Sequence, residues 1–303
     1  MHILAVADER AGVRNQAQGL AEALATHVGG RARLLVVSSK DRKRFSSLTD
    51  SVPDVAIGCG RAAQSELVAL RQRGAKTVYV QDPRKGYGRF DLVVAPKHDQ
   101  VLAANAIATT GGPHRVTVER LGEAAREWEE FAGLPSPKVA VMIGGKSKRH
   151  DFDAEALAAH TKAMADVLAL GGSLMISVSR RTDEVIADGY ARLAERHPGR
   201  VRVYCGEGPN PYLGFLAHAE AVMVTEDSSN MLVEACATGV PVFRLPMAGS
   251  AGKLGALYAD LEDRCGVRRW DGSFAVQSYP PLAETERVAV EIAERLGLVV
   301  SAR

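Results

Sequence analysis

The sequence has no long hydrophobic run and no strong excess of charge of either sign. All of its apolar stretches fall short of the roughly 18 residues that a membrane-spanning helix needs. It contains 38 lysines and arginines against 36 aspartates and glutamates, a formal net charge of +2. A balance so close to neutral argues against a nucleic-acid partner for the whole molecule. Aromatic residues make up only 5%, yet 46% of the residues are hydrophobic, which excludes an intrinsically disordered chain.

Cysteine is also scarce. Cys59, Cys205, Cys236 and Cys265 lie far apart with no CxxC pair, which argues against a structural zinc site and against a disulfide framework. The first residues, MHILAVADER, lack a basic region and turn acidic, so they do not predict a signal peptide. We therefore expect a cytoplasmic protein without a metal site, and the sequence leaves peripheral association with a membrane open.

Short β-branched runs alternate with longer amphipathic patterns, which predicts the α/β class with parallel sheets. The predicted strands are His2–Ala7, Arg33–Val37, Asp54–Gly58, Thr77–Gln81, Asp91–Ala95, Lys138–Ile143, Ser173–Val178, Arg200–Tyr204, Ala221–Thr225 and Val240–Arg244. The predicted helices are Val13–His27, Ala62–Arg73, Asp153–Leu170, Asp183–Arg196, Pro211–Ala219, Ser229–Thr238 and Ala283–Leu296. This order predicts two Rossmann-like domains that face each other across a cleft, with ligands at the carboxyl ends of the strands.

The length of 303 residues also favours two domains, because single hydrophobic cores stop growing near that size. The segment Gly-Leu-Pro-Ser-Pro at 133–137 predicts a linker between them. We therefore expect an N-terminal domain over 1–134 and a C-terminal domain over 137–280. Residues 281–303 are expected to contain a helix that packs back on the N-terminal domain through a narrow apolar side.

Polar residues follow several predicted strands of the N-terminal half. Asp8, after the first strand, and His98, after the fifth, are candidate general bases that would deprotonate a substrate hydroxyl. The same loops supply the residues expected to contact a substrate, namely Arg10, Gly12, Asn15, Gln16, Gly60, Arg61, Gln81 and Asp82. The alternatives are a helix-capping role for the acidic residue and a loop-fixing hydrogen bond for the histidine.

The third predicted strand leads into Gly-Cys-Gly-Arg-Ala-Ala at 58–63, which fits the dinucleotide pattern GxGxxA, and Asp82 follows about 20 residues later. A nicotinamide-binding dehydrogenase is therefore an open alternative. The motif lies in the third strand–helix unit rather than the first, and Arg61 crowds the turn. Both points favour a tight strand–helix turn in which only glycine fits.

In the C-terminal half, two neighbouring predicted strands are followed by cationic loops. The first loop begins with a Gly-Gly turn whose N–H groups suit a phosphate, and the second adds hydroxyl and guanidinium groups. The residues expected to bind the phosphates of a nucleotide are Gly144, Gly145, Lys146, Lys148, Ser179, Arg180 and Arg181. For either loop alone, a solvated basic surface is the alternative.

The stretch TEDSSNMLVEACATGVPV at 225–242 is the most informative part of the sequence. Asp227, Ser228, Ser229 and Asn230 crowd the start of a helix, where N–H groups and the helix dipole favour a diphosphate. Glu234 lies about one turn later on the face of Asn230. The stretch resembles the donor-binding signature of GT-B glycosyltransferases, which implies that Glu234 holds the ribose of a nucleotide-sugar. An ion pair between Glu234 and Arg244 or another basic group is the structural alternative.

Five segments together point to one family. They run in order along the chain: DERAGVRNQAQGLAEAL, PDVAIGCGR, the pair VYVQDPR and FDLVVAPKHD, IGGKSKRHDF, and TEDSSNMLVEACATGVPV. They resemble the plant mitochondrial-fission family called "elongated mitochondria", whose bacterial members are described as nucleoside-diphosphate-sugar enzymes. The resemblance implies a GT-B-like fold. The first loop has Glu9 where the family's DGRxG-type motif has glycine.

We interpret the sequence as a metal-independent glycosyltransferase that takes a nucleotide-diphosphate sugar as co-substrate and uses no other cofactor. The C-terminal domain would bind this donor, and the N-terminal domain would bind an acceptor that the sequence does not identify. Two alternatives share the fold: a nucleotide-sugar epimerase or hydrolase, and a non-catalytic interaction protein related to mitochondrial fission factors.

Overall fold

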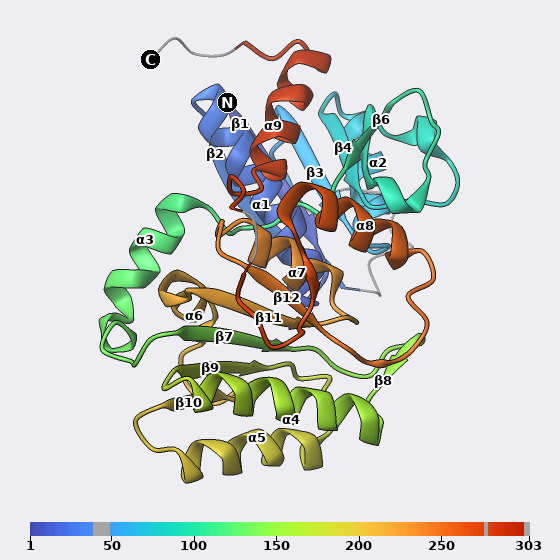
Figure 1. The fold of residues 1–303 in the computed structure, drawn as a ribbon. Helices are drawn as coiled ribbons and strands as arrows, with labels where there is room; N and C mark the ends of the chain where they lie inside the picture. The colour runs from blue at the N-terminus through green and yellow to red at the C-terminus, as the bar shows by residue number, and fades with distance from the viewer. Residues whose placement is uncertain (39–48, 276–277, 300–303) are drawn as a thin grey trace. The chain divides into compact units, whose positions relative to one another are not determined.

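The computed structural model describes residues 1–38, 49–275 and 278–299, and the chain divides into two compact units (Figure 1). Unit 1 consists of Met1–Arg115 together with the segment that begins at Ala283, and unit 2 consists of Val116–Leu282. Each unit is built on its own parallel sheet, so the predicted α/β class with two Rossmann-like domains is confirmed.

Unit 1 has a parallel sheet in the order β2-β1-β3-β4-β5-β6. Its strands are β1 (His2–Ala7), β2 (Arg31–Val36), β3 (Val55–Cys59), β4 (Lys76–Val80), β5 (Leu92–Pro96) and β6 (Ala106–Thr109). Its helices are α1 (Ala11–Val28), α2 (Ala63–Gln72) and α9 (Glu284–Arg295), with short 3₁₀ turns η2 (Tyr87–Arg89) and η3 (Lys97–Asp99). The chain runs from β1 to β2 and returns to β3 on the other side of β1. The strand order therefore reverses between β1 and β3, which is the position where open α/β sheets bind ligands.

Unit 2 repeats this plan in the order β10-β9-β7-β11-β12-β14. Its strands are β7 (Lys138–Ile143), β9 (Ser173–Val178), β10 (Val201–Tyr204), β11 (Ala221–Thr225), β12 (Val242–Leu245) and β14 (Arg268–Arg269), and β8 (His150–Asp151) pairs separately with β13 (Ala248–Gly249). Its helices are α3 (Val118–Glu127), α4 (Ala154–Ala169), α5 (Glu184–Arg196), α6 (Tyr212–His218), α7 (Ser229–Cys236) and α8 (Leu254–Cys265), with one 3₁₀ turn, η4 (Glu129–Phe131). Here the strand order reverses between β7 and β11.

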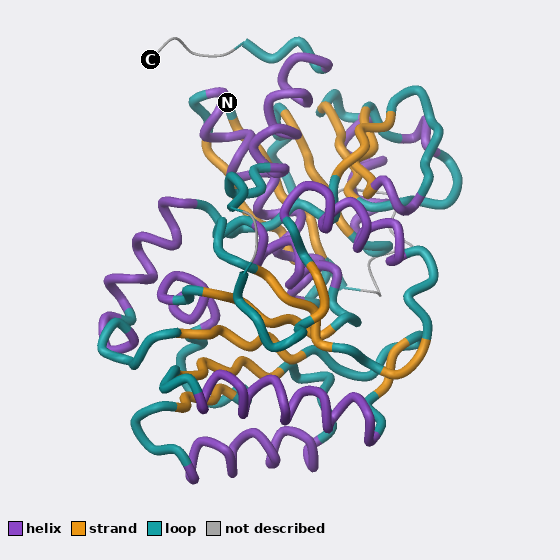
Figure 2. Tube along the Cα trace, viewed as in Figure 1, coloured by secondary structure: helices purple, strands orange, loops and turns teal. Residues whose placement is uncertain are grey.

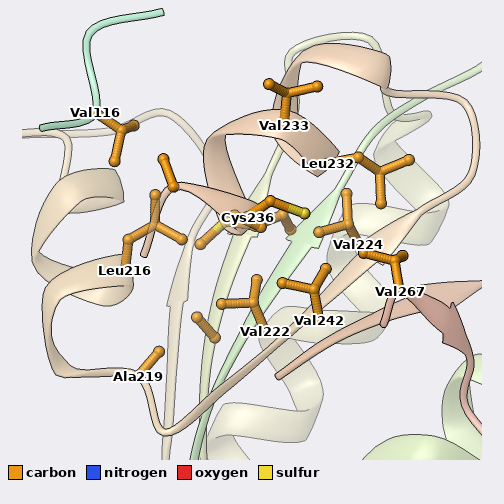
Figure 3. Packing of buried hydrophobic residues seen from close by; sticks show 14 of the residues in the cluster. Val116, Leu216, Ala219, Val222, Val224, Leu232, Val233, Cys236, Val242 and Val267 are labelled. Atoms are coloured by element: carbon orange, nitrogen blue, oxygen red, sulfur yellow. The ribbon is translucent and has the colours of Figure 1, made fainter. Parts of the chain in front are cut away.

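Alternate residues of the unit 2 strands feed two separate cores. Val139, Val141 and Ile143 of β7 pack with α4 and α5 on one face, whereas Ala140 and Met142 pack with α6, α7 and α8 on the other. Figure 2 shows the helices of this unit on both sides of its strands. In Figure 3, side chains of α7, Cys236 among them, lie over the valines of β11 and β12. Because both faces are covered, the strands read as continuous apolar runs.

Several predicted elements agree with the structure to the residue, among them β1, β7, β9 and β11. The observed elements that were not predicted include β6, α3 and α8, besides the two-residue strands β8, β13 and β14 and the 3₁₀ turns. Strand β6 was not predicted because it is only four residues long. Helix α3 was not predicted because it has few apolar residues beyond Leu121 and Ala124. Helix α8 does carry a helical spacing of buried residues, at Leu257, Tyr258 and Leu261, so its signal was present in the sequence.

The division between the units lies at 115/116, not at the predicted 134. Segment 116–134 belongs to unit 2 because α3 and η4 pack against α6. The ring of Trp128 stacks on Phe131 at a centroid distance of 5.5 Å, and Phe131 contacts Phe215 at 5.0 Å. Gly214 allows this approach, since a Cβ there would lie 2.5 Å from the Trp128 side chain.

Helix α9 packs against α1 within unit 1. Val288, Ala289, Ile292 and Ala293 are buried in the same apolar cluster as the α1 side chains. At its N-terminus, Glu284 accepts a hydrogen bond from the backbone N–H of Thr110 at 2.9 Å. The last helix thus completes the core of the first unit.

Replacing Val288 by Ala should lower the free energy of unfolding by about 2 kcal/mol, because the lost methyl groups leave a cavity beneath α9. Val290 on the same helix is 37% exposed, whereas Val288 is 0% exposed, so Val290→Ala is the matched control. The control should change stability by no more than about 0.5 kcal/mol. Urea denaturation of both variants gives the comparison. Equal effects of the two substitutions would show that α9 does not bury this face.

Candidate functional site

The carboxyl ends of three unit 2 strands meet at the side chain of Asp227. One carboxylate oxygen accepts hydrogen bonds from Gly145 N–H at 3.0 Å and from the Arg181 guanidinium at 2.9 Å. The other accepts from the Thr225 hydroxyl at 2.7 Å, and that hydroxyl accepts from Gly144 N–H at 2.7 Å. The loops after β7, β9 and β11 are therefore adjacent, as their positions in the sequence predicted.

The Gly-Gly turn is folded around this carboxylate. A Cβ at Gly144 would lie 2.0 Å from Asp227 Oδ1, so only glycine allows the aspartate to approach. The Asp227 side chain itself is 0% exposed. The sequence assigned the N–H groups of this turn to a phosphate, but in the structure Gly145 N–H donates to a carboxylate of the chain. That part of the predicted phosphate site is corrected, because an internal anion already occupies it.

The cations of the two loops differ in their surroundings. Arg181 is ion-paired with Asp227, and Lys146 is ion-paired with Asp151 at 2.5 Å. This pairing raises the pKa of Lys146 and lowers the pKa of Asp151. Lys148 and Arg180 are exposed, and Ser179, beside Arg180, accepts a hydrogen bond from Arg181 N–H at 3.2 Å. Lys146 and Arg181 are exposed as well, but each already has a carboxylate partner. Lys148 and Arg180 are therefore better placed to meet an anion from solvent.

Helix α7 begins directly beside this network, next to the point where the strand order reverses. The Ser228 hydroxyl caps the helix by accepting from Met231 N–H at 3.4 Å. Ser229 and Asn230 form the first turn and are half-buried. The amides of a first helical turn point out of the helix end, where they and the helix dipole favour a negative charge.

Glu234, one turn further along α7, is buried and bonded within the protein. Its carboxylate accepts a hydrogen bond from the Tyr212 hydroxyl of α6 at 2.5 Å. Burial raises the pKa of Glu234 to about 7, although the bond from Tyr212 acts in the opposite direction. The alternative ion pair with Arg244 is wrong, because Arg244 bonds to Glu226 at 2.9 Å. Tyr212 was missed from the sequence because it lies 22 residues before its partner.

In unit 1, the loops at the reversal between β1 and β3 border a cavity of about 1300 Å³. It is lined by Asp8, Glu9, Arg10, Val37, Ser38, Gly60, Arg61, Gln64, Tyr79, Gln81, Asp82, Pro83, Arg84 and Lys85. Six of the residues predicted from the sequence thus come together here: Asp8, Arg10, Gly60, Arg61, Gln81 and Asp82.

Asp8 and Arg10 form an ion pair at the edge of this cavity. Arg10 Nη2 lies 2.6 Å from Asp8 Oδ2, and Arg10 Nε lies 3.0 Å from Asp8 Oδ1. The hydrogen bond to Asp8 raises the pKa of Arg10. Gly60 lies beneath the pair with φ +82°, and a Cβ there would be 2.8 Å from Val13 and 3.0 Å from Asp8 Oδ2. Asp8 is therefore held in a fixed position by Arg10.

The remaining predicted residues of unit 1 do not line the cavity. Gln16 is buried and supports it, because its Oε1 accepts from the Gln81 amide at 3.2 Å. Gly12 and Asn15 lie in the first turns of α1, and His98 lies half-buried in η3. Of the two candidate bases, only Asp8 is at the cavity.

The GxGxxA motif has a packing explanation. A Cβ at Gly58 would lie 2.6 Å from the Leu67 side chain of α2, and Gly60 has the positive φ that other residues avoid. Both glycines are thus required by the turn between β3 and α2. This geometry favours the tight-turn reading over a nicotinamide site.

Within the described residues, no group of three or more His, Cys, Asp or Glu side chains is arranged to hold a metal ion. Over the same part of the chain, no helix has both the length and the apolar character needed to cross a membrane.

Replacing Asp227 by Ala should destabilise unit 2 by about 2–4 kcal/mol, because the Gly145 N–H and the Arg181 guanidinium lose a buried partner. Asp188, exposed on α5, provides the matched control, and its replacement by Ala should change stability by no more than about 0.5 kcal/mol. Thermal and urea unfolding measure both variants. A near-neutral Asp227→Ala would show that the three loops do not depend on this carboxylate.

Comparison with solved structures identifies the architecture. The chain is similar to the UDP-GlcNAc 2-epimerase of Methanocaldococcus jannaschii, with a TM-score of 0.60 and 11% identity, covering 97% of this chain and 100% of that one. It is also similar to the UDP-GlcNAc 2-epimerase of Neisseria meningitidis, with a TM-score of 0.59 and 10% identity, covering 98% and 99% of the two chains. At such low identity these likenesses show the fold alone, and the predicted GT-B-like fold is confirmed.

Comparison of sequences identifies the family. The chain is 30% identical over 304 aligned residues to the mitochondrial fission protein ELM1 of Arabidopsis thaliana, covering 89% of this chain and 71% of that protein. It is 22% identical to the uncharacterized protein RP120 of Rickettsia prowazekii (strain Madrid E), covering 95% of this chain and 97% of that one. The family model described as mitochondrial fission ELM1 matches residues 11–296. The chain therefore belongs to the mitochondrial fission ELM1 family.

Proposed function

We propose that unit 2 binds a nucleotide-diphosphate sugar and that the protein is a metal-independent glycosyltransferase. The observation that carries this proposal is the start of α7 beside the β7–β11 reversal. There, Ser228, Ser229 and Asn230 precede Glu234 on one helix, at the position where open parallel sheets bind ligands. Hydroxyls, first-turn amides and a helix dipole together suit a diphosphate.

The internal Asp227 carboxylate directs the diphosphate to a particular part of this edge. Because it occupies the Gly-Gly turn, the phosphates would bind the first turn of α7, with the exposed Arg180 and Lys148 as cations nearby. The buried Glu234 would hold the ribose from one turn below, with Tyr212 fixing its carboxyl group. Preorganised donors of this kind stabilise the charge that develops on a leaving diphosphate.

Transfer would replace one bond to the anomeric carbon of the sugar by another. The acceptor hydroxyl oxygen would attack that carbon, the bond from the carbon to the diphosphate oxygen would break, and the nucleoside diphosphate would leave with the electron pair. Asp8 would take the proton of the hydroxyl, since Arg10 holds its carboxylate in place. Among the two candidate bases, its position at the unit 1 cavity favours Asp8 over His98.

The structural relatives indicate which donor to test first. The M. jannaschii enzyme is described in complex with UDP-GlcNAc and UDP, and the N. meningitidis enzyme bound to UDP-GlcNAc. UDP-GlcNAc is therefore the first donor to test.

Incubating UDP-GlcNAc with the protein alone also separates the proposed glycosyltransferase from the two alternative functions. A new epimer or free sugar would favour an epimerase or hydrolase on the same fold. If the protein binds UDP but does not convert UDP-GlcNAc with any acceptor tested, a non-catalytic role is favoured, like that implied by the name of the Arabidopsis relative.

Glu234→Gln tests the proposed ribose contact. The substitution keeps the size of the side chain but removes the charge that the carboxyl carries above its pKa of about 7. At pH 8 the affinity for UDP should therefore fall about 10- to 100-fold, or 1.5–3 kcal/mol. Calorimetric titration of UDP into both proteins measures the change. Glu262→Gln, at an exposed glutamate of α8, is the control and should bind as the wild type does. Unchanged affinity in Glu234→Gln would reject the ribose contact.

The buried carboxyl of Glu234 also predicts a pH-dependent stability. Its pKa rises from 4.5 to about 7 on folding, so between these pH values the folded protein holds a proton that the unfolded chain has released. The free energy of unfolding should therefore fall by about 2–3 kcal/mol as the pH rises through this range. Glu234→Gln should lack this fall, whereas Glu262→Gln should keep it. Parallel pH profiles for wild type and Glu234→Gln would contradict the burial of an acidic group here.

A further inference from the structure

Two non-glycine residues that line the unit 1 cavity have a positive φ, a backbone conformation that is rare outside glycine. Gln81, at the carboxyl end of β4, has φ 89°, and Arg84 has φ 66°, although neither is glycine. Both line the cavity, together with Gly60 at φ +82°. Strained non-glycine residues cluster at ligand sites, because there the position of the side chain matters more than the cost of the backbone.

The charges of this cavity are divided between its two sides. On the β1 side, Asp8 is neutralised by Arg10, and Glu9 adds an exposed carboxylate. On the β3–β4 side, the cavity is lined by three exposed cationic residues, Arg61, Arg84 and Lys85.

Asp82, the carboxylate that the described residues place on the cationic side, is already engaged. Asp82 Oδ1 accepts hydrogen bonds from Arg84 N–H at 2.7 Å and from the Tyr87 hydroxyl at 2.8 Å. These bonds turn the backbone at Arg84 and hold the carboxylate in the loop. The ends of β3 and β4, which carry the cations, are adjacent because Cys59 pairs with Val80. Three cations thus gather on neighbouring loops around an open volume.

We infer that this cavity binds a phosphorylated, hydroxyl-bearing compound, with the phosphate at Arg61, Arg84 and Lys85 and the hydroxyls toward Asp8 and Glu9. Guanidinium groups form paired hydrogen bonds with phosphate oxygens, and carboxylates accept hydrogen bonds from hydroxyls. If the proposed glycosyl transfer is correct, this compound is the acceptor. Only this role rests on the proposed function; the binding itself does not. The phosphate can belong to a soluble metabolite or to the headgroup of a lipid.

Two probes separate these sources. Glycerol 3-phosphate, titrated calorimetrically at low salt into the full chain, represents a soluble ligand. Sedimentation with phosphatidylcholine vesicles, with and without phosphatidic acid, represents a lipid headgroup. We expect binding to at least one phosphate probe, and we expect it to weaken as salt is added, because the contact is ionic. Binding to neither probe would overturn the inference.

The double variant Arg61→Gln/Arg84→Gln should weaken that binding at least tenfold. Arg89→Gln is the matched control, because Arg89 is an exposed arginine of the same loop that does not line the cavity. It should bind like the wild type. Melting temperatures check that all variants fold. Equal binding by the double variant and the wild type would overturn the inference, as would equal losses in the double variant and the control.

UDP titrations of the same proteins keep this test independent of the proposed function. The double variant should bind UDP as the wild type does, because its substitutions lie in unit 1. Loss of the phosphate probe with UDP binding intact supports the cavity assignment. Absence of UDP binding in every protein, with the phosphate probe still bound, would reject the donor site in unit 2 and leave the cavity assignment standing.

Discussion

The carboxylate of Asp227 is the contact on which the loops at the carboxyl ends of the unit 2 strands depend. It is fully buried, and it bonds to Gly145, Thr225 and Arg181, so that one side chain fixes the ends of β7, β9 and β11. Because a carboxylate now occupies the glycine turn, a second anion at that turn would meet both steric and charge repulsion. The positive end of α7 is then the part of this edge best suited to a diphosphate.

Unit 1 also has an aspartate that is ion-paired with an arginine at the end of a strand, but the surroundings of the pair differ. Asp8 follows β1 at the reversal of that sheet and is held by Arg10, over a glycine that lets the pair sit close to the backbone. In unit 2 the aspartate is enclosed by its loops, whereas in unit 1 the pair remains at the border of an open cavity. An aspartate held by an arginine thus joins the loops in one unit and lines a cavity in the other.

The sequence predicted the sheets well because fully buried parallel strands leave a strong apolar signal. It also predicted that the loops after β7 and β9 are neighbours, because the carboxyl ends of parallel strands meet at one edge of a sheet. Hydrogen bonds between side chains that are far apart in the sequence could not be predicted from it. Asp227 meets Gly145 across 82 positions, and Glu234 meets Tyr212 across 22 positions. The sequence therefore located the glycine turn correctly but gave it a phosphate instead of a carboxylate. The division at 115/116 depends on how α3 packs, which local composition does not show.

The central claim is that a nucleoside diphosphate binds at the start of α7. Hydrogen–deuterium exchange with and without saturating UDP tests it most directly, because the first-turn amides are the proposed donors. The account predicts slower exchange over 227–234, with little change across α4 and α5 on the far face of the same sheet. Unchanged exchange at the start of α7, in a sample shown to bind UDP, would contradict the account.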